Sequence, residues 1–173
     1  MAAIFAFTCA CCGRLHEGSP NIAYSSPWHY SQLTEEERTS IAKIGADLCK
    51  ITHADVTDYF VRCILEIPIE GVAEPFTWGV WSSLSASSFR RYVETYEAPV
   101  DGEVFFGWLC NRLPCYPDTI SLAADIHVQL GGTRPKLRLH LGKADDHPLV
   151  MDQLNGISIA RAQEIAEYVH RVG

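Results

Sequence analysis

Apolar and polar residues alternate along four stretches of the chain, which predicts half-buried β-strands at 59–69, 76–84, 120–130 and 137–141. The turn sequence GVAEP lies between the first two stretches, and GGTRP lies between the last two, so each pair is expected to form an antiparallel hairpin. A further apolar run, EVFFGWLC, has the length of a strand. The two prolines of NRLPCYPDT predict a loop directly after it.

Three other stretches have the periodicity of amphipathic helices. Thr34 followed by three glutamates forms a capping box, and apolar residues up to Leu48 recur at helical spacing, which predicts a helix over about 35–48. Ser85 and Ser158 are each placed to cap a later helix. The apolar faces of these two helices are Phe89, Tyr92, Val93 and Tyr96 in the first, and Ile159, Ala162, Ile165, Val169 and Val172 in the second.

These elements do not alternate strand by helix, so the sequence predicts an α+β fold in which a mainly antiparallel sheet is packed by about three helices. A length of 173 residues corresponds to about one domain. We therefore expect a single domain over 1–173. Residues 1–53 would hold a cysteine-rich start, a loop and the first helix, and residues 54–173 would hold the sheet with two further helices.

Charge and apolar content narrow the class of partner. The 14 Lys and Arg residues against 21 Asp and Glu residues give a net charge of −7, which disfavours binding to nucleic acids and to anionic membrane surfaces. Charges interrupt every apolar run before the roughly 18 residues that a membrane span needs. The sequence has no G-x-S-x-G elbow, phosphate-binding glycine loop, dinucleotide fingerprint or H-E-x-x-H motif.

The cysteines suggest a metal site. Cys9 and Cys12 have C-x-x-C spacing and are followed by Gly13, as in a knuckle whose two thiolates share one zinc ion. His16 is close enough to add an imidazole, and Cys49, at the end of the predicted first helix, is the candidate fourth ligand, with His53 in reserve. The expected cofactor is zinc, bound by Cys9, Cys12, His16 and Cys49. Because four protein ligands leave no open position, such an ion would be structural.

Two alternatives for these cysteines stay open. Free cysteines are often small buried hydrophobes without a ligand. A redox-active C-x-x-C is the other alternative, but it would be expected at the start of a helix in a βαβ unit. The total of seven cysteines is odd, and three of them crowd into positions 9–12, which suits a reducing cytoplasm better than a disulfide framework.

Three further groups of residues are candidates for binding or catalysis. His147 and Asp118 lie in segments of irregular pattern, beside the aromatic residues Trp108 and Tyr116. Asp146, the neighbour of His147, is a candidate to orient its imidazole for acid–base chemistry, although such a pair is also common in polar turns. Trp78, Trp81 and Trp108 are candidates for an aromatic pocket. Polar residues of the strands would line a groove, or form a solvated sheet face, if both hairpins join one sheet. These residues are Arg62, Glu66, Trp81, Asp125, His127, Arg138 and His140.

Several motifs are shared with a known family. The runs CACCGRLH, FVRCILEIPI, FTWGVWSSLS, FGWLCNRLPCYPDT and GISIARAQEIAEYV resemble the bacterial family called domain of unknown function 2199, over nearly the whole chain. The resemblance implies a single bacterial, cytoplasmic domain whose cysteine and histidine positions are Cys9, Cys12, His16 and Cys49. It implies no particular activity. Cys11 departs from a plain knuckle and competes for the role of ligand.

Three classes of function follow. The leading class is a zinc-stabilised protein that binds and regulates or neutralises another macromolecule, and an immunity- or antitoxin-type role is one version of it. The second class is an enzyme. It would be a metal-dependent hydrolase with three ligands and a bound water, or a metal-free enzyme that uses the aromatic loops with His147 and Asp118. The third class is a small-molecule sensor with a tryptophan-lined pocket.

Overall fold

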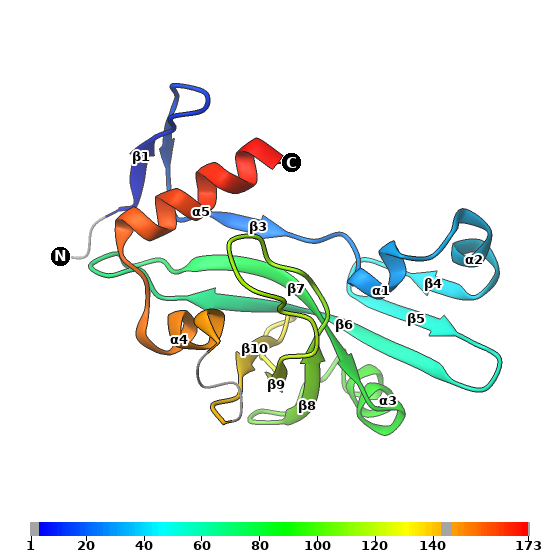
Figure 1. The fold of residues 1–173 in the computed structure, drawn as a ribbon. Coiled ribbons are helices and arrows are strands. Elements are labelled where there is room, and N and C mark those ends of the chain that lie inside the picture. The colour runs from blue at the N-terminus through cyan, green and yellow to red at the C-terminus, as the bar shows by residue number, and fades with distance from the viewer. Residues whose placement is uncertain (1–3, 143–146, 173) are drawn as a thin grey trace.

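A computed structural model describes residues 4–142 and 147–172, and a long antiparallel hairpin lies at its centre (Figure 1). Its strands are β6 (Thr57–Ile67) and β7 (Phe76–Leu84), which pair from Tyr59↔Leu84 to Ile67↔Phe76. The predicted hairpin is confirmed. Alternate residues of β6 from Val61 to Ile67 are buried, so one face of this strand packs in the core.

Five strands close into a barrel with mixed pairing. After β7 come β8 (Val104–Leu109), β9 (Ala123–His127) and β10 (Lys136–Leu139), each antiparallel to the strand before it. The second predicted hairpin, β9–β10, is therefore also confirmed. β10 then pairs in parallel with β6 and completes the ring. The α+β class is confirmed, but the antiparallel sheet of the sequence prediction is a closed barrel.

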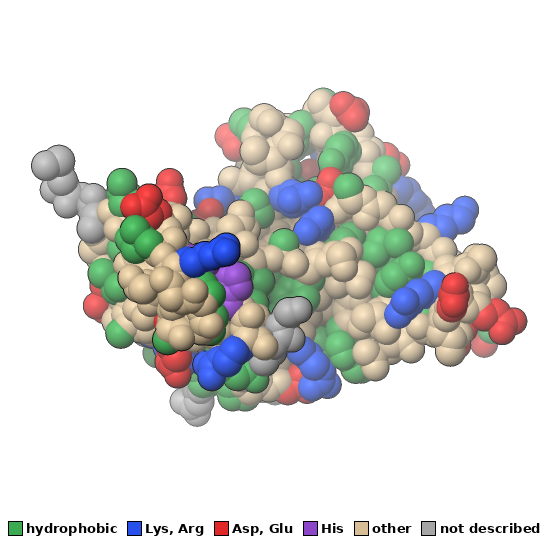
Figure 2. All heavy atoms as spheres, turned by 90° about the horizontal axis from the view of Figure 1, so that it is seen from above, with side chains coloured by type: hydrophobic (Ala, Val, Ile, Leu, Met, Phe, Trp, Pro, Cys, Tyr) green, Lys and Arg blue, Asp and Glu red, His purple; other side chains and the backbone are tan. Residues whose placement is uncertain are grey.

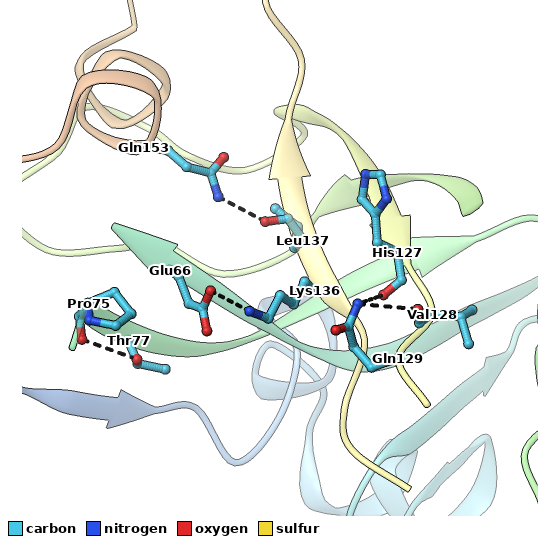
Figure 3. Close-up of polar contacts among 9 residues, drawn as sticks. All are labelled: Glu66, Pro75, Thr77, His127, Val128, Gln129, Lys136, Leu137 and Gln153. Atoms are coloured by element: carbon cyan, nitrogen blue, oxygen red, sulfur yellow. Dashed lines mark hydrogen bonds and ion pairs between the residues drawn. The ribbon is translucent and has the colours of Figure 1, made fainter. Parts of the chain in front are cut away.

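The barrel is joined at its seam by a side chain from a helix. Among the described residues, the β6–β10 ladder consists of the pair Lys136↔Ile64. Beyond it, Gln153 donates from Nε2 to Leu137 O at 2.9 Å (Figure 3). It also accepts at Oε1 from Leu139 N at 2.8 Å. A continued parallel ladder would pair these two backbone groups with β6. The Gln153 amide thus takes the place of a strand peptide group.

Further strands extend the sheet on both sides of the central hairpin. β3 (Asn21–Ala23) runs parallel to β7, while β5 (Leu48–Thr52) pairs with β6, and β4 (Ala42–Ile44) lies outside β5. The helix predicted over 35–48 is therefore wrong beyond its first part. The helix ends at Ser40, and 42–52 form a hairpin whose turn is closed by Gly45 N donating to Leu48 O. Pairing with β6 outweighs helical spacing here.

The described residues contain five helices where about three were expected. The two short ones are α1 (Trp28–Ser31) and α2 (Glu35–Ser40), and the longer ones are α3 (Ala86–Glu94), α4 (Pro148–Asn155) and α5 (Ile159–Val172). Both predicted serine caps are confirmed, because Ser85 Oγ accepts from Ser88 N and Ser158 Oγ accepts from Arg161 N. No helix in the described part is long and apolar enough to cross a membrane.

Buried apolar residues form two clusters in the described chain. The larger one fills the barrel and the spaces under α3, α4 and α5. The smaller one lies on the outer face of the β6–β7 hairpin and consists of Cys49, Ile51, Phe60, Trp81 and Cys110. The division into 1–53 and 54–173 places β5 in the first part although it pairs with β6. The expectation of a single domain stays a prediction.

The capping box of α2 gives a pH-dependent prediction. Thr34 N donates to Glu37 Oε2 at 2.8 Å, and this bond is the main reason that the pKa of the Glu37 carboxyl lies below its ordinary value. The contact therefore stabilises the folded chain above the unfolded pKa and is lost as the pH falls through the lower folded pKa. An NMR titration of the Glu37 carboxyl carbon should give a midpoint below 4.5, and a midpoint at or above that value would contradict the prediction.

Candidate metal site

The N-terminal hairpin presents the candidate ligands at one tip. Its strands β1 (Ala6–Thr8) and β2 (Leu15–Glu17) pair antiparallel, and the loop between them is closed by Cys9 N donating to Arg14 O and by Gly13 N donating to Cys9 O. Gly13 has φ +66°, a left-handed conformation that favours glycine. Residues 9–13 therefore form a tight turn that depends on the glycine after Cys12.

The sulfur atoms of Cys9, Cys11 and Cys12 all lie within 4.8 Å of one another. Cys9 is buried, and the other two are exposed. His16 lies on β2, and its Nε2 atom is 3.4 Å from Cys12 Sγ. Zinc binds thiolates at about 2.3 Å in a tetrahedron, so the three sulfur atoms need little movement to share one ion. The His16 imidazole contacts Cys12 and would have to move toward Cys9 and Cys11 to join them. The residues present fit a metal ion.

The thiols of the cluster influence one another's protonation. Cys9 Sγ and Cys11 Sγ are 2.7 Å apart, and this hydrogen bond is the main cause that lowers the pKa of Cys9 and raises the pKa of Cys11 to about 11. The thiolate is the form that binds metals. The cluster therefore favours the first thiolate at Cys9, with the Cys11 thiol as its hydrogen-bond donor.

Helix α5 supports the hairpin from below (Figure 1). Glu167 Oε1 accepts from Ala10 N at 2.9 Å, and the His16 ring lies between the rings of Phe7 and His170, with centroids 5.2 Å and 5.1 Å away. A hollow of about 450 Å³ adjoins these rings. The view from above shows this face, with hydrophobic side chains around the hollow and a histidine and basic side chains at its margin (Figure 2).

Cys49 lies elsewhere in the fold. It belongs to strand β5 rather than to the end of a helix, and it is buried in the smaller core cluster beside Phe60 and Trp81. Burial raises the pKa of its thiol to about 12, which favours the protonated form. His53, the reserve ligand, follows β5 and lies 3.5 Å from Asp58. Of the expected ligands, the structure brings together Cys9, Cys12 and His16, adds Cys11, and does not bring Cys49 to them.

The tryptophans do not form one pocket. Trp78 and Trp81 are completely buried in different core clusters, whereas Trp108 is 45% exposed on the outside of β8. Tyr116, expected near Trp108, donates its hydroxyl to Asp152 at 2.8 Å. The alternation along 76–84 predicts one buried face, whereas both faces of β7 are buried, with Trp78 on one and Trp81 on the other.

His147 and Asp118 are engaged in backbone contacts. His147 caps α4 by accepting from Leu149 N at Nδ1, and its Nε2 lies 3.3 Å from Asp118 O. The Asp118 carboxylate accepts from Ile120 N and lies 3.5 Å from Arg112. These contacts give both residues a structural role. Asp146, the neighbour suggested as a partner for His147, lies outside the described residues.

The polar strand residues divide into separate groups. Asp125 and His140 pair at 2.7 Å on the outside of the barrel, and Arg62 donates to Ala46 O. Glu66 and Arg138 instead line a cleft at the barrel seam, together with Gln153. Gln153 was not among the predicted residues because it lies on α4, a helix that no periodic pattern in the sequence predicted.

Comparison with known proteins places the chain in a bacterial family. A family model described as an uncharacterized protein conserved in bacteria, DUF2199, matches residues 8–157, which include the knuckle, the barrel and α4. No curated protein and no solved structure matches the chain. The match spans most of the 173 residues and agrees with the resemblance drawn from the cysteine, W-G-V-W and F-G-W-L motifs. The chain therefore belongs to the DUF2199 family of bacterial proteins.

Proposed function

We propose that the N-terminal hairpin binds one zinc ion and that this ion is structural. The observation that carries the proposal is the approach of three cysteine sulfur atoms to within 4.8 Å of one another, with an imidazole nitrogen 3.4 Å from one of them. The ligands in this proposal are Cys9, Cys11, Cys12 and His16. Cys11 replaces Cys49 in the set because it belongs to the cluster and Cys49 does not.

A closed set of four protein ligands gives the ion a folding role. The hairpin has strands of three residues, and an isolated hairpin of this size is marginal in water. Zinc held across its tip would add free energy that is available only in the folded state. The contacts of Ala10 with Glu167 and of His16 with His170 would pass this stabilisation to α5.

We further propose that the protein acts by binding another macromolecule in the bacterial cytoplasm. Support comes from the net charge of −7 and from the structural engagement of His147 and Asp118. An immunity- or antitoxin-type role fits an acidic protein of this size. The metal-dependent version of the enzyme alternative requires an open coordination position, which the proposed set of four ligands would not leave.

The zinc proposal predicts the metal content of three proteins. Mass spectrometry of untagged protein should find one zinc per chain in the wild type, about the same amount in Cys49→Ser, and little in Cys12→Ser. Each variant loses one thiol, so a difference between them shows whether zinc depends on the cysteine cluster or on cysteines elsewhere in the chain.

Two results would contradict this proposal. Wild-type protein that holds no metal, even after incubation with zinc under reducing conditions, would return the cysteines to packing or redox roles. If Cys49→Ser loses zinc while Cys11→Ser keeps it, the ligand set expected from the sequence would replace the one proposed above.

A further inference from the structure

A cleft lies where β6 and β10 separate at the barrel seam. It has a volume of about 530 Å³ and is lined mainly by apolar side chains of β6, β10, α4 and the segment after β6. The apolar residues include Ile64, Ile69, Val72, Leu139, Val150 and Leu154. Its volume is in the range of pockets that bind small molecules or a few residues of a peptide, roughly 300–1,000 Å³.

One residue interrupts the hydrogen bonding along this edge of β6. Ile64 N donates to Pro135 O, and Pro68 O accepts from Ile157 N, so the edge is paired before and after Glu66. The peptide groups of Glu66 point the same way as those of Ile64, because direction repeats every two residues in a strand. The β10 groups that would meet Glu66 are occupied by Gln153 instead. Glu66 thus presents a strand edge to the cleft.

The cleft is lined by two basic side chains and one acidic side chain, so positive charge is in excess among its described residues. Glu66 Oε2 is paired with Lys136 Nζ at 2.8 Å across the seam (Figure 3). Arg138 also lines the cleft and is exposed, and within the described residues it has no ion pair. A guanidinium that has no ion pair among the described residues and lies beside an apolar cleft favours a ligand with a carboxylate.

We propose that this cleft binds an extended peptide segment of a partner protein. The segment would pair with the backbone of Glu66, place an apolar side chain among the leucine, isoleucine and valine residues of the cleft, and place an acidic residue at Arg138. Added strands obtain affinity from backbone hydrogen bonds and specificity from pockets for alternate side chains. The inference rests on the proposed binding role and names its partner, but it does not depend on zinc.

The test is a selection from a displayed library of random octapeptides against the full-length protein. Selected peptides should combine apolar residues with an acidic one, and isothermal titration should show roughly tenfold weaker binding to Arg138→Glu than to wild type. Arg90→Glu is the matched control, because Arg90 is exposed on α3 and outside the cleft, so this variant should bind like wild type. N-methylation of the peptide backbone should abolish binding.

The proposal is overturned if no selected peptide distinguishes Arg138→Glu from Arg90→Glu. It is also overturned if N-methylated peptides bind equally well, or if octanoate competes as strongly as the peptides, since the cleft would then recognise an apolar carboxylate rather than a strand. Metal content is measured separately, so failure here and failure of the zinc proposal are distinguishable.

Discussion

Replacing Gly107 with alanine is expected to lower the free energy of unfolding by about 3 kcal/mol, at the upper end of the usual cost of overpacking. A Cβ at this position would lie 2.5 Å from the backbone oxygen of Ser83 and closer still to Ser82 Oγ. Gly107 pairs with Leu84 in the β7–β8 ladder, so the backbone of β7 cannot move away without breaking the barrel. The clash must therefore be relieved by separating paired strands.

Urea unfolding of wild type and Gly107→Ala measures this loss. Gly45→Ala is the control, because its Cβ would meet nothing closer than Leu48 O at 3.9 Å, and it should change stability by less than about 0.5 kcal/mol. If Gly107→Ala were as stable as Gly45→Ala, the close approach of β7 and β8 would be wrong.

Replacing Asn111 with alanine is expected to cost about 3 kcal/mol, because two backbone groups would lose their partners. The Asn111 amide is 2% exposed, accepts from Trp81 N at 2.7 Å, and donates to Ser26 O at 2.9 Å. It thereby joins the loop before α1 to the middle of β7. Alanine would leave the buried N–H of Trp81 and the half-buried carbonyl of Ser26 without these hydrogen bonds.

Thermal unfolding at matched zinc content compares Asn111→Ala with Gln32→Ala. Gln32 is an exposed amide that donates to a neighbouring serine, so its loss should change stability by less than about 0.5 kcal/mol. Equal melting temperatures for the two variants would show that Asn111 does not bridge the loop and β7.

Local patterns predicted the parts of the fold that depend on nearby residues. The β6–β7 and β9–β10 hairpins follow from alternation with a turn between the strands, and the serine caps follow from short-range hydrogen bonding. Barrel closure could not be predicted in this way. It rests on the pair Lys136↔Ile64 and on the Gln153 amide, which are far apart in sequence and carry no periodic pattern.

In the candidate metal site, too, the contacts between residues close in sequence were predicted and the position of a distant residue was not. Cys9, Cys12 and His16 are close in sequence, and a β-hairpin brings them together. Cys49 was assigned to the end of a helix, and its position changed when Ile41–Cys49 formed a turn and strands instead. Helical spacing of apolar residues in this segment is also compatible with a short hairpin, so periodicity alone could not decide between the two.

The two core clusters lie on opposite faces of the same strands, β6 and β7. Val80 packs in the barrel, and its neighbour Trp81 packs in the smaller cluster. A slip of β7 by one residue would exchange the sides of Val80 and Trp81, and because both of these residues are apolar, polarity at these two positions would not oppose the exchange. Volume would oppose it, because an indole does not fit the space of a valine in a close-packed interior. At these positions, side-chain size therefore selects the correct pairing register of this hairpin.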